Sequence, residues 1–226
     1  MRSLLRTFSG VLVVAGIILI ADAALSVLWQ EPVSALYARV QQGKLDDQLA
    51  ELDEAPSTPL ERRALARLPN PDRRLAFAAR SLDRRTSAGK AVGRIEIPSI
   101  GLDKVVVDGT DGGSLRKGPG HYPSTPLPGV HGTVAIAGHR TTYGAPFRRI
   151  DRVRAGQLIE VDMPYGRFSY RVERTRIVPP TATWVTQRVS YDRLVLSACH
   201  PLYSAAKRIV VFARLVRATP EGSAKA

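Results

Sequence analysis

The chain has 226 residues, a formal net charge of +13 at pH 7 and 44% hydrophobic residues. This composition excludes a wholly disordered chain, and the length allows one full domain with accessory segments. The single cysteine excludes an intrachain disulfide and a four-cysteine zinc site. The basic charge predicts attraction to an anionic partner, such as acidic lipid, cell-wall polymer or nucleic acid.

The charge is distributed unevenly along the chain. Residues 1–59 carry four Lys/Arg against seven Asp/Glu, whereas residues 60–94 carry ten against three. Residues 95–226 carry 19 against 10. This distribution predicts a segmented chain rather than one uniform body.

The first thirty residues predict a transmembrane anchor. Arg2 and Arg6 precede an apolar run from Phe8 to Trp29, which contains one charged residue, Asp22. As a helix the run would span roughly 33 Å, about one hydrocarbon core. The basic residues before it place the N-terminus in the cytoplasm. A cleaved signal peptide is the alternative, because residues 21–23 have the small-x-small form of a cleavage site. Both interpretations place the rest of the chain outside the cell.

Residues 31–91 predict an extracellular stalk or linker. Residues 33–54 have the pattern of a polar, partly amphipathic helix with Val33, Leu36 and Val40 as its apolar residues, and the Pro-containing stretch 55–59 ends it. Residues 60–85 are rich in arginine and predict short helices interrupted at Pro71. This stretch is either a solvated spacer, which its composition favours, or a basic patch on anionic lipid or wall polymer.

From residue 93 the sequence takes on a β pattern. Short runs rich in β-branched residues are bounded by Gly, Pro and Asp, and helical turns are expected over 111–117 and 145–153. The strand candidates are 93–98, 105–107, 133–137, 158–161, 168–177, 194–198 and 208–216. Many short strands and few long helices predict a mainly β domain, a barrel or a sandwich.

Two residues at predicted strand ends suggest nucleophilic catalysis. Cys199 follows the apolar strand 194–198, and it is either a nucleophile or a buried inert thiol. A cysteine nucleophile needs a base or a positive neighbour, and His139 follows another strand. Spacing alone does not separate His139 from His200, although adjacent strand residues point to opposite faces and disfavour His200 as the partner.

Arg208 is the third candidate, because it opens the last strand. A short connection joins strands 194–198 and 208–212, so a hairpin would bring Arg208 near Cys199. A guanidinium there is able to hold a substrate carbonyl and a developing oxyanion.

Taken in order, these motifs resemble those of sortases, most closely class E. The segment 136–147 (IAGHRTTYGAPF) is similar to the histidine motif, and the segments 120–123 (GHYP) and 127–129 (LPG) match the stretch before it. Residues 196–199 (LSAC) stand in place of the Thr-Leu-x-Thr-Cys motif, and Arg208 follows at the usual short distance.

The resemblance covers residues 92–217 and implies a closed eight-stranded sortase β-barrel with short helices. Residues 1–30 are then the cytoplasmic tip and anchor, 31–91 the stalk, and 218–226 a flexible tail. Cys199 is expected to attack the threonine carbonyl of a C-terminal Leu-Ala-x-Thr-Gly or Leu-Pro-x-Thr-Gly signal. Arg208 is expected to stabilise the oxyanion, and His139 to protonate the departing glycine amine. The implied partners are secreted proteins bearing the signal and a peptidoglycan-precursor amine.

The same resemblance suggests residues that contact the substrate. Tyr122 and Tyr143 are candidates for the lining of a peptide groove, with barrel packing as the alternative. Trp184, in the loop before the cysteine strand, is either a lid residue or a packing anchor. The sequence departs from the family motif at Val195 and Ala198, where the family has threonine. The change at Ala198 removes a hydroxyl expected beside the nucleophile.

The sequence alone is compatible with other functions. An L,D-transpeptidase or a Cys-His protease would use the same residue types, although the L,D-transpeptidase motif Ser-His-Gly-Cys is not matched by residues 197–199. A non-catalytic basic module that binds the cell envelope is a further alternative. Nucleic acid is disfavoured, because the chain is exported and its aromatic residues do not cluster with the basic runs. No cofactor motif is found, and Asp103, Asp108 and Asp111 are expected to be turn and cap residues rather than calcium ligands.

Overall fold

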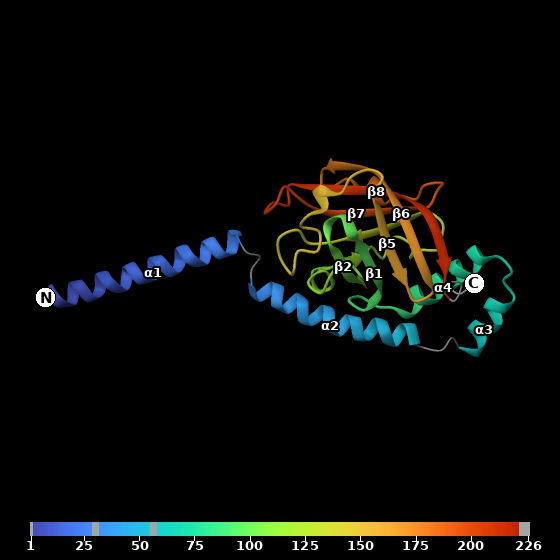
Figure 1. Cartoon of the computed structure of the whole chain (residues 1–226), viewed down its shortest axis with the longest axis horizontal. Coiled ribbons are helices and arrows are strands. Elements are labelled where there is room, and N and C mark those ends of the chain that lie inside the picture. The colour runs from blue at the N-terminus through green and yellow to red at the C-terminus, as the bar shows by residue number, and fades with distance from the viewer. Residues whose placement is uncertain (1, 29–31, 55–57, 222–226) are drawn as a thin grey trace.

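The structure is a computed structural model that describes residues 2–28, 32–54 and 58–221. Trp29, at the end of the predicted anchor, and most of the predicted linker break lie outside the described residues. Eight strands form a closed barrel in the order β1-β2-β3-β4-β7-β8-β6-β5 (Figure 1). The strands are β1 (Ala91–Ile97), β2 (Leu102–Asp108), β3 (Gly120–His121), β4 (Thr133–Ala137), β5 (Leu158–Met163), β6 (Gly166–Val178), β7 (Arg193–His200) and β8 (Lys207–Pro220). The predicted eight-stranded barrel is therefore confirmed.

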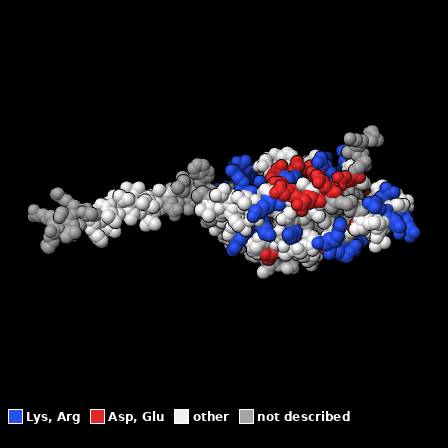
Figure 2. Space-filling model, turned by 90° about the horizontal axis from the view of Figure 1, so that it is seen from below, with Lys and Arg blue, Asp and Glu red and all other residues white. Residues whose placement is uncertain are grey.

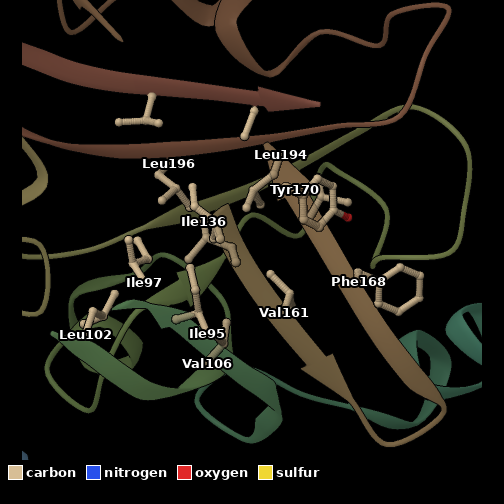
Figure 3. Close-up of a cluster of buried hydrophobic side chains, with 14 of the residues drawn as sticks. Ile95, Ile97, Leu102, Val106, Ile136, Val161, Phe168, Tyr170, Leu194 and Leu196 are labelled. Atoms are coloured by element: carbon tan, nitrogen blue, oxygen red, sulfur yellow. The ribbon is translucent and has the colours of Figure 1, made fainter. Parts of the chain in front are cut away.

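The barrel interior is filled by alternate residues of the strands. Ile95, Ile136, Val161, Leu194 and Leu196 point into one cluster of buried apolar side chains (Figure 3). The alternation follows from the two-residue repeat of a strand, which sends successive side chains to opposite faces. Burial of these residues provides the main stabilisation of the barrel.

Two helices before the barrel pack on its surface. Leu45 and Leu49 of α2 (Pro32–Glu54) form a buried cluster with Ala91, Val105 and Val107 of the first two strands. Because these leucines recur four residues apart, they lie on one face of the helix. This packing agrees with the amphipathic character expected over residues 33–54, and the charged side chains of α2 are exposed.

The helix α4 (Pro71–Arg85) closes one end of the barrel. Leu75, Ala79 and Leu82 lie on one face of this helix and join the main core cluster, so the solvated spacer favoured for residues 60–85 is wrong for α4. The helix α3 (Pro59–Ala66) precedes it, and Glu61 of α3 accepts a hydrogen bond from Ser81 Oγ of α4. The predicted break near Pro71 is present, because the residues between the two helices are not helical.

The first helix, α1 (Arg2–Leu28), projects away from the barrel (Figure 1). Its described apolar side chains, such as Leu12 and Ile18, are exposed. The sequence predicts a transmembrane anchor here. Within residues 2–28, 32–54 and 58–221, no helix is both long and apolar enough to cross a membrane.

The remaining helical elements are short. They are α5 (Gly112–Leu115), η1 (Pro98–Ile100), η2 (Ile150–Arg152) and η3 (Thr183–Thr186). Two of them, α5 and η2, lie where helical turns are predicted. At the C-terminus, β8 continues beyond residue 217 and pairs Ala218 with Phe168 of β6, so this part of the predicted tail belongs to the sheet.

Acidic and basic side chains gather separately on the face seen from the α2 side (Figure 2). Arg94 of β1 forms ion pairs with Asp46 of α2 and Asp103 of β2. Arg167 pairs with Asp162 through Nε and Oδ1 at 2.5 Å. The ion pair of Arg94 with Asp46 joins α2 to the barrel. The acidic side chains gathered on this face are therefore partly neutralised by neighbouring arginines.

Candidate active site

Cys199 lies near the C-terminal end of β7 and is partly exposed. Ala198 and Leu196 point into the core cluster, whereas Val195 belongs to a second cluster on the outer face of the barrel. The alternation along the strand therefore places Cys199 on the outer face. Cys199 pairs with Arg208 of β8 in the antiparallel ladder, so the predicted hairpin brings these residues together.

His139 reaches the same end of the barrel by a parallel strand. β4 and β7 pair in parallel, with Ala137 opposite Ser197. The N–H of Gly138 donates to the carbonyl of Ser197 at 3.0 Å, which extends the pairing by one residue. His139 and Cys199 each lie two residues beyond this last pair. Parallel strands end at the same edge, so the histidine and the cysteine lie at one end of the barrel.

The loop that carries His139 turns back tightly on itself. A Cβ at Gly138 would lie 2.6 Å from Cδ2 of Phe147, so only glycine allows this approach. The N–H of Phe147 donates to the carbonyl of His139 at 2.9 Å. Phe147 is buried in the core, and it anchors the far end of the loop. These contacts hold the backbone of His139 between two fixed points.

The environment of His139 favours its neutral form. Burial lowers the pKa of the imidazole, and the Arg116 guanidinium lowers it further. The ring centroid of Tyr143 lies 5.4 Å from that of His139, and Cζ of Arg116 lies 5.6 Å from the Tyr143 centroid. A neutral imidazole is able to accept a proton from a thiol, and its cation is able to donate that proton to a leaving amine.

The Arg208 side chain is held by its own loop. Its Nη1 donates to the carbonyl of Ala205 at 2.9 Å and to that of Lys207 at 3.0 Å. These bonds use one of the guanidinium nitrogens, and the other donors are able to bind a substrate carbonyl.

A buried apolar cluster lies on the outer face of the barrel, the face of β7 that carries Cys199. Residues of β4, β7, β8 and the loop before β7 form a cluster with Tyr122 packed against it. The buried members are Ala135, Val178, Ala182, Val185, Val195, Val210 and Phe212. The Trp184 ring stacks on Phe212 with 6.1 Å between centroids and remains 41% exposed. The cluster is covered by the loop before β7, and Trp184 is its exposed edge.

The predicted substrate residues therefore have different positions. Tyr122 and Trp184 pack against the buried apolar cluster, and Tyr143 packs beside His139. Ala198 is buried on the opposite face of β7, inside the barrel. The residue that replaces the family threonine thus contacts the core, and its side chain is separated from the outer surface by the strand.

Sequence reasoning missed two arginines of this site. Arg116 influences His139, and Arg140 contacts the carbonyl of Cys199 at 3.4 Å. The position of Arg140 next to His139 was a usable signal, because a charged residue after an apolar strand needs a partner. The sequence around Arg116 gives no comparable signal, because Arg116 comes near His139 only in the folded chain.

A metal-binding cluster is not found in the part of the chain that the structure describes, where no three His, Cys, Asp or Glu residues come together. Asp111 accepts hydrogen bonds from the N–H groups of Gly113 and Ser114, and it caps α5. Asp103 pairs with Arg94, and Asp108 lies 3.4 Å from Nδ1 of His121. The three aspartates thus have separate structural partners.

Comparisons with known proteins agree on one family. The Sortase domain family model matches residues 95–216, more than half of the chain. Sortase D of Bacillus subtilis is 33% identical over 132 residues, which cover 57% of this chain and 65% of that protein. Sortase SrtE1 of Streptomyces coelicolor is 24% identical over 153 residues, 61% of this chain and 44% of that protein. The chain thus matches less than two thirds of the length of these two relatives.

Solved structures show the same likeness. Sortase E from Streptomyces avermitilis superposes with a TM-score of 0.56 at 30% identity, and covers 62% of this chain and 97% of its own. The Clostridium perfringens sortase D5 transpeptidase superposes with a TM-score of 0.62 at 22% identity, covering 79% and 99%, and supports the fold alone.

Proposed function

The chain belongs to the sortase family, and we propose that it is a class E-like cysteine transpeptidase that cleaves a C-terminal sorting signal. Members of the family are cysteine transpeptidases. The observation that carries the proposal is the convergence of Cys199, His139 and Arg208 at one barrel end. The proposed signal is Leu-Ala-x-Thr-Gly or Leu-Pro-x-Thr-Gly, cut between threonine and glycine. The identity to a class E structure favours this class, and the relative named sortase D makes class D the comparison to test.

In the proposed reaction the Cys199 thiolate attacks the threonine carbonyl carbon. The guanidinium of Arg208 stabilises the oxyanion that forms. When this intermediate collapses, the carbon–nitrogen bond breaks and the His139 imidazolium gives its proton to the departing amine. A thioester on Cys199 remains.

An amine of a cell-wall precursor then attacks the thioester carbonyl. Neutral His139 accepts the proton of the attacking amine, and the thiolate of Cys199 leaves. The new amide joins the protein to peptidoglycan. Water in place of the amine would give hydrolysis by the same steps.

The outer face of the barrel beside Cys199 is the proposed binding site for the signal. The side chain of the signal leucine would pack against the exposed ring of Trp184, at the edge of the buried cluster that contains Val195 and Val210. The strands fix the shape of this face, whereas the loop before β7 sets which residue follows leucine in an accepted signal.

We also propose that the barrel works outside the cell membrane, with the N-terminal segment as its anchor. The support is the sequence, in which Arg2 and Arg6 precede the apolar run. Protease added to intact cells is expected to degrade the barrel, and the N-terminal segment is expected in the membrane fraction. A barrel that stays intact until the cells are lysed contradicts this location.

The test of the activity uses the full-length chain in detergent with quenched fluorescent peptides carrying each signal, with and without triglycine. Cleavage after threonine, with ligation that depends on triglycine, is the expected result. Cys199→Ala is expected to abolish both, and mass spectrometry is expected to show an acyl adduct on wild-type Cys199. The absence of cleavage and of an adduct with both peptides would favour a non-catalytic basic module that binds the envelope.

A further inference from the structure

Arg140, which follows His139, is a buried arginine. Its side chain is 3% exposed, whereas Arg149 in the same loop is exposed. Burying a guanidinium is costly unless charged or polar groups surround it. The groups that contact Arg140 therefore show which parts of the structure its buried guanidinium holds together.

The guanidinium contacts three segments of the chain. Nη1 donates to the carbonyl oxygen of Cys199 at 3.4 Å and lies 3.2 Å from Nδ1 of His200. Nη2 lies 3.0 Å from Oδ1 of Asp151 and donates to the carbonyl of Arg148 at 3.4 Å. A guanidinium has only donors, so Nδ1 of His200 accepts in this contact. The two terminal nitrogens thus connect the end of β7, the returning part of the loop and η2.

This arrangement links the base to the nucleophile through the backbone. His139 and Arg140 are consecutive, and Arg140 binds the carbonyl of the residue that carries the thiol. A shift of the loop away from β7 would break the bonds to Cys199 and His200 together. The separation between the imidazole and the thiol therefore depends on Arg140.

We propose that Arg140 is a positioning residue that holds the His139 loop against the Cys199 end of β7. Its bond to Cys199 is made to the backbone carbonyl, so it acts through the placement of His139 and Cys199. The expected effect on turnover rests on the proposed function, whereas the effect on the environment of His139 does not. Misplacement of a catalytic group by about 1 Å costs up to about 100-fold in rate.

The experiment compares full-length Arg140→Met, Arg140→Lys and the matched control Arg149→Met. Methionine keeps much of the apolar stem and removes every donor. We expect Arg140→Met to lower kcat by about 10- to 100-fold with KM unchanged. Arg140→Lys is expected to give an intermediate kcat, because a single ammonium replaces the two terminal nitrogens that contact the end of β7 and η2. Arg149→Met is expected to match the wild type.

A second measurement is independent of turnover. The chain has four histidines, so single substitutions assign the imidazole signals in NMR spectra. Burial is the main cause that lowers the pKa of His139, and Arg116 is the charged group that acts on it. A loosened loop exposes the ring, so its titration midpoint is expected to rise in Arg140→Met and to stay unchanged in Arg149→Met.

Each outcome has a defined meaning. A folded Arg140→Met variant with wild-type kcat and an unmoved His139 midpoint would overturn the proposal. If Arg140→Met does not fold, Asp151→Asn weakens the same contact and is expected to move both values less. Unchanged values in folded Asp151→Asn would equally contradict it. If the wild type cleaves no peptide, the proposed function fails, and the His139 midpoint alone decides the role of Arg140.

Discussion

Cys199 and Arg208 are direct cross-strand partners on β7 and β8. Side chains of such partners lie on one face, with Cβ atoms about 4.5–5.5 Å apart. The hydrogen bonds between β7 and β8 fix this separation, although the loop that joins the two strands is exposed. The pairing therefore places Arg208 and Cys199 on neighbouring strands before substrate binds, with the guanidinium held by the carbonyls of Ala205 and Lys207.

Arg208→Lys is expected to lower kcat/KM by about 100- to 1,000-fold, because an ammonium lacks the fork that holds both the loop carbonyls and an oxyanion. The measurement is peptide cleavage with the full-length chain. Arg217→Lys, an exposed arginine near the far end of the same strand, is the control and is expected to leave the rate unchanged. Equal kcat/KM values for Arg208→Lys and Arg217→Lys would mean that Arg208 has no role in the reaction.

The pH dependence of cleavage is expected to follow His139. Burial and Arg116 lower the pKa of the imidazole, so the cation that protonates the leaving amine is lost as pH rises through this lowered value. Arg116→Gln removes a nearby positive charge, which raises the pKa of His139. The alkaline limb of kcat against pH is therefore expected to move upward.

The expected shift is small, because Arg116 is exposed and solvent and salt screen its charge. Arg217→Gln makes the same charge change far from the site and serves as the control. A downward movement of the alkaline limb, or an equal movement in both variants, contradicts the assignment of the limb to His139.

The local pattern predicted a mainly β domain, and the resemblance to sortases narrowed it to a closed eight-stranded barrel. Cys199 and His139 were proposed because each follows an apolar strand, and the resemblance favoured His139 over His200. The residues of both strands that precede them are buried. The sequence did not predict that Ala198 faces the core. Whether a strand side chain points inward or outward depends on the register with the neighbouring strands. In the structure Ala198 points into the core.

The side of α2 that packs on the barrel was not predicted from the sequence. The expected apolar residues Leu36 and Val40 are exposed, whereas Leu45 and Leu49 pack on the barrel. The hydrogen bonds of Gln42 to the barrel join residues 63 positions apart or more, and no local pattern encodes such contacts. For the same reason the closeness of Arg116 to His139 becomes visible only in the folded chain.

Trp184 is expected to contribute to binding of the signal. Its ring stacks on Phe212 with an interplanar angle of 8° and remains partly exposed at the edge of the buried apolar cluster. Trp184→Ala should therefore raise KM for the signal peptide more than it lowers kcat. Trp184→Phe keeps an aromatic ring for stacking and is expected to retain most of the affinity. If Trp184→Ala leaves KM unchanged and only lowers the unfolding temperature, the residue is a packing anchor.

Gln42 should be needed for the stability of the full chain. Its side-chain amide accepts from the N–H of Val105 at 2.9 Å and donates to the carbonyls of Val105 at 3.1 Å and Lys117 at 2.9 Å. Gln42→Ala leaves the N–H of Val105, a buried residue, without this acceptor, which costs about 1–3 kcal/mol of unfolding free energy. Gln48→Ala on the same helix is the control, because its side chain is only partly buried. Urea unfolding followed by circular dichroism measures both variants. Equal midpoints for the two would mean that α2 does not stabilise the barrel through Gln42, and a loss confined to Gln42→Ala would show that this helix is part of the folded unit.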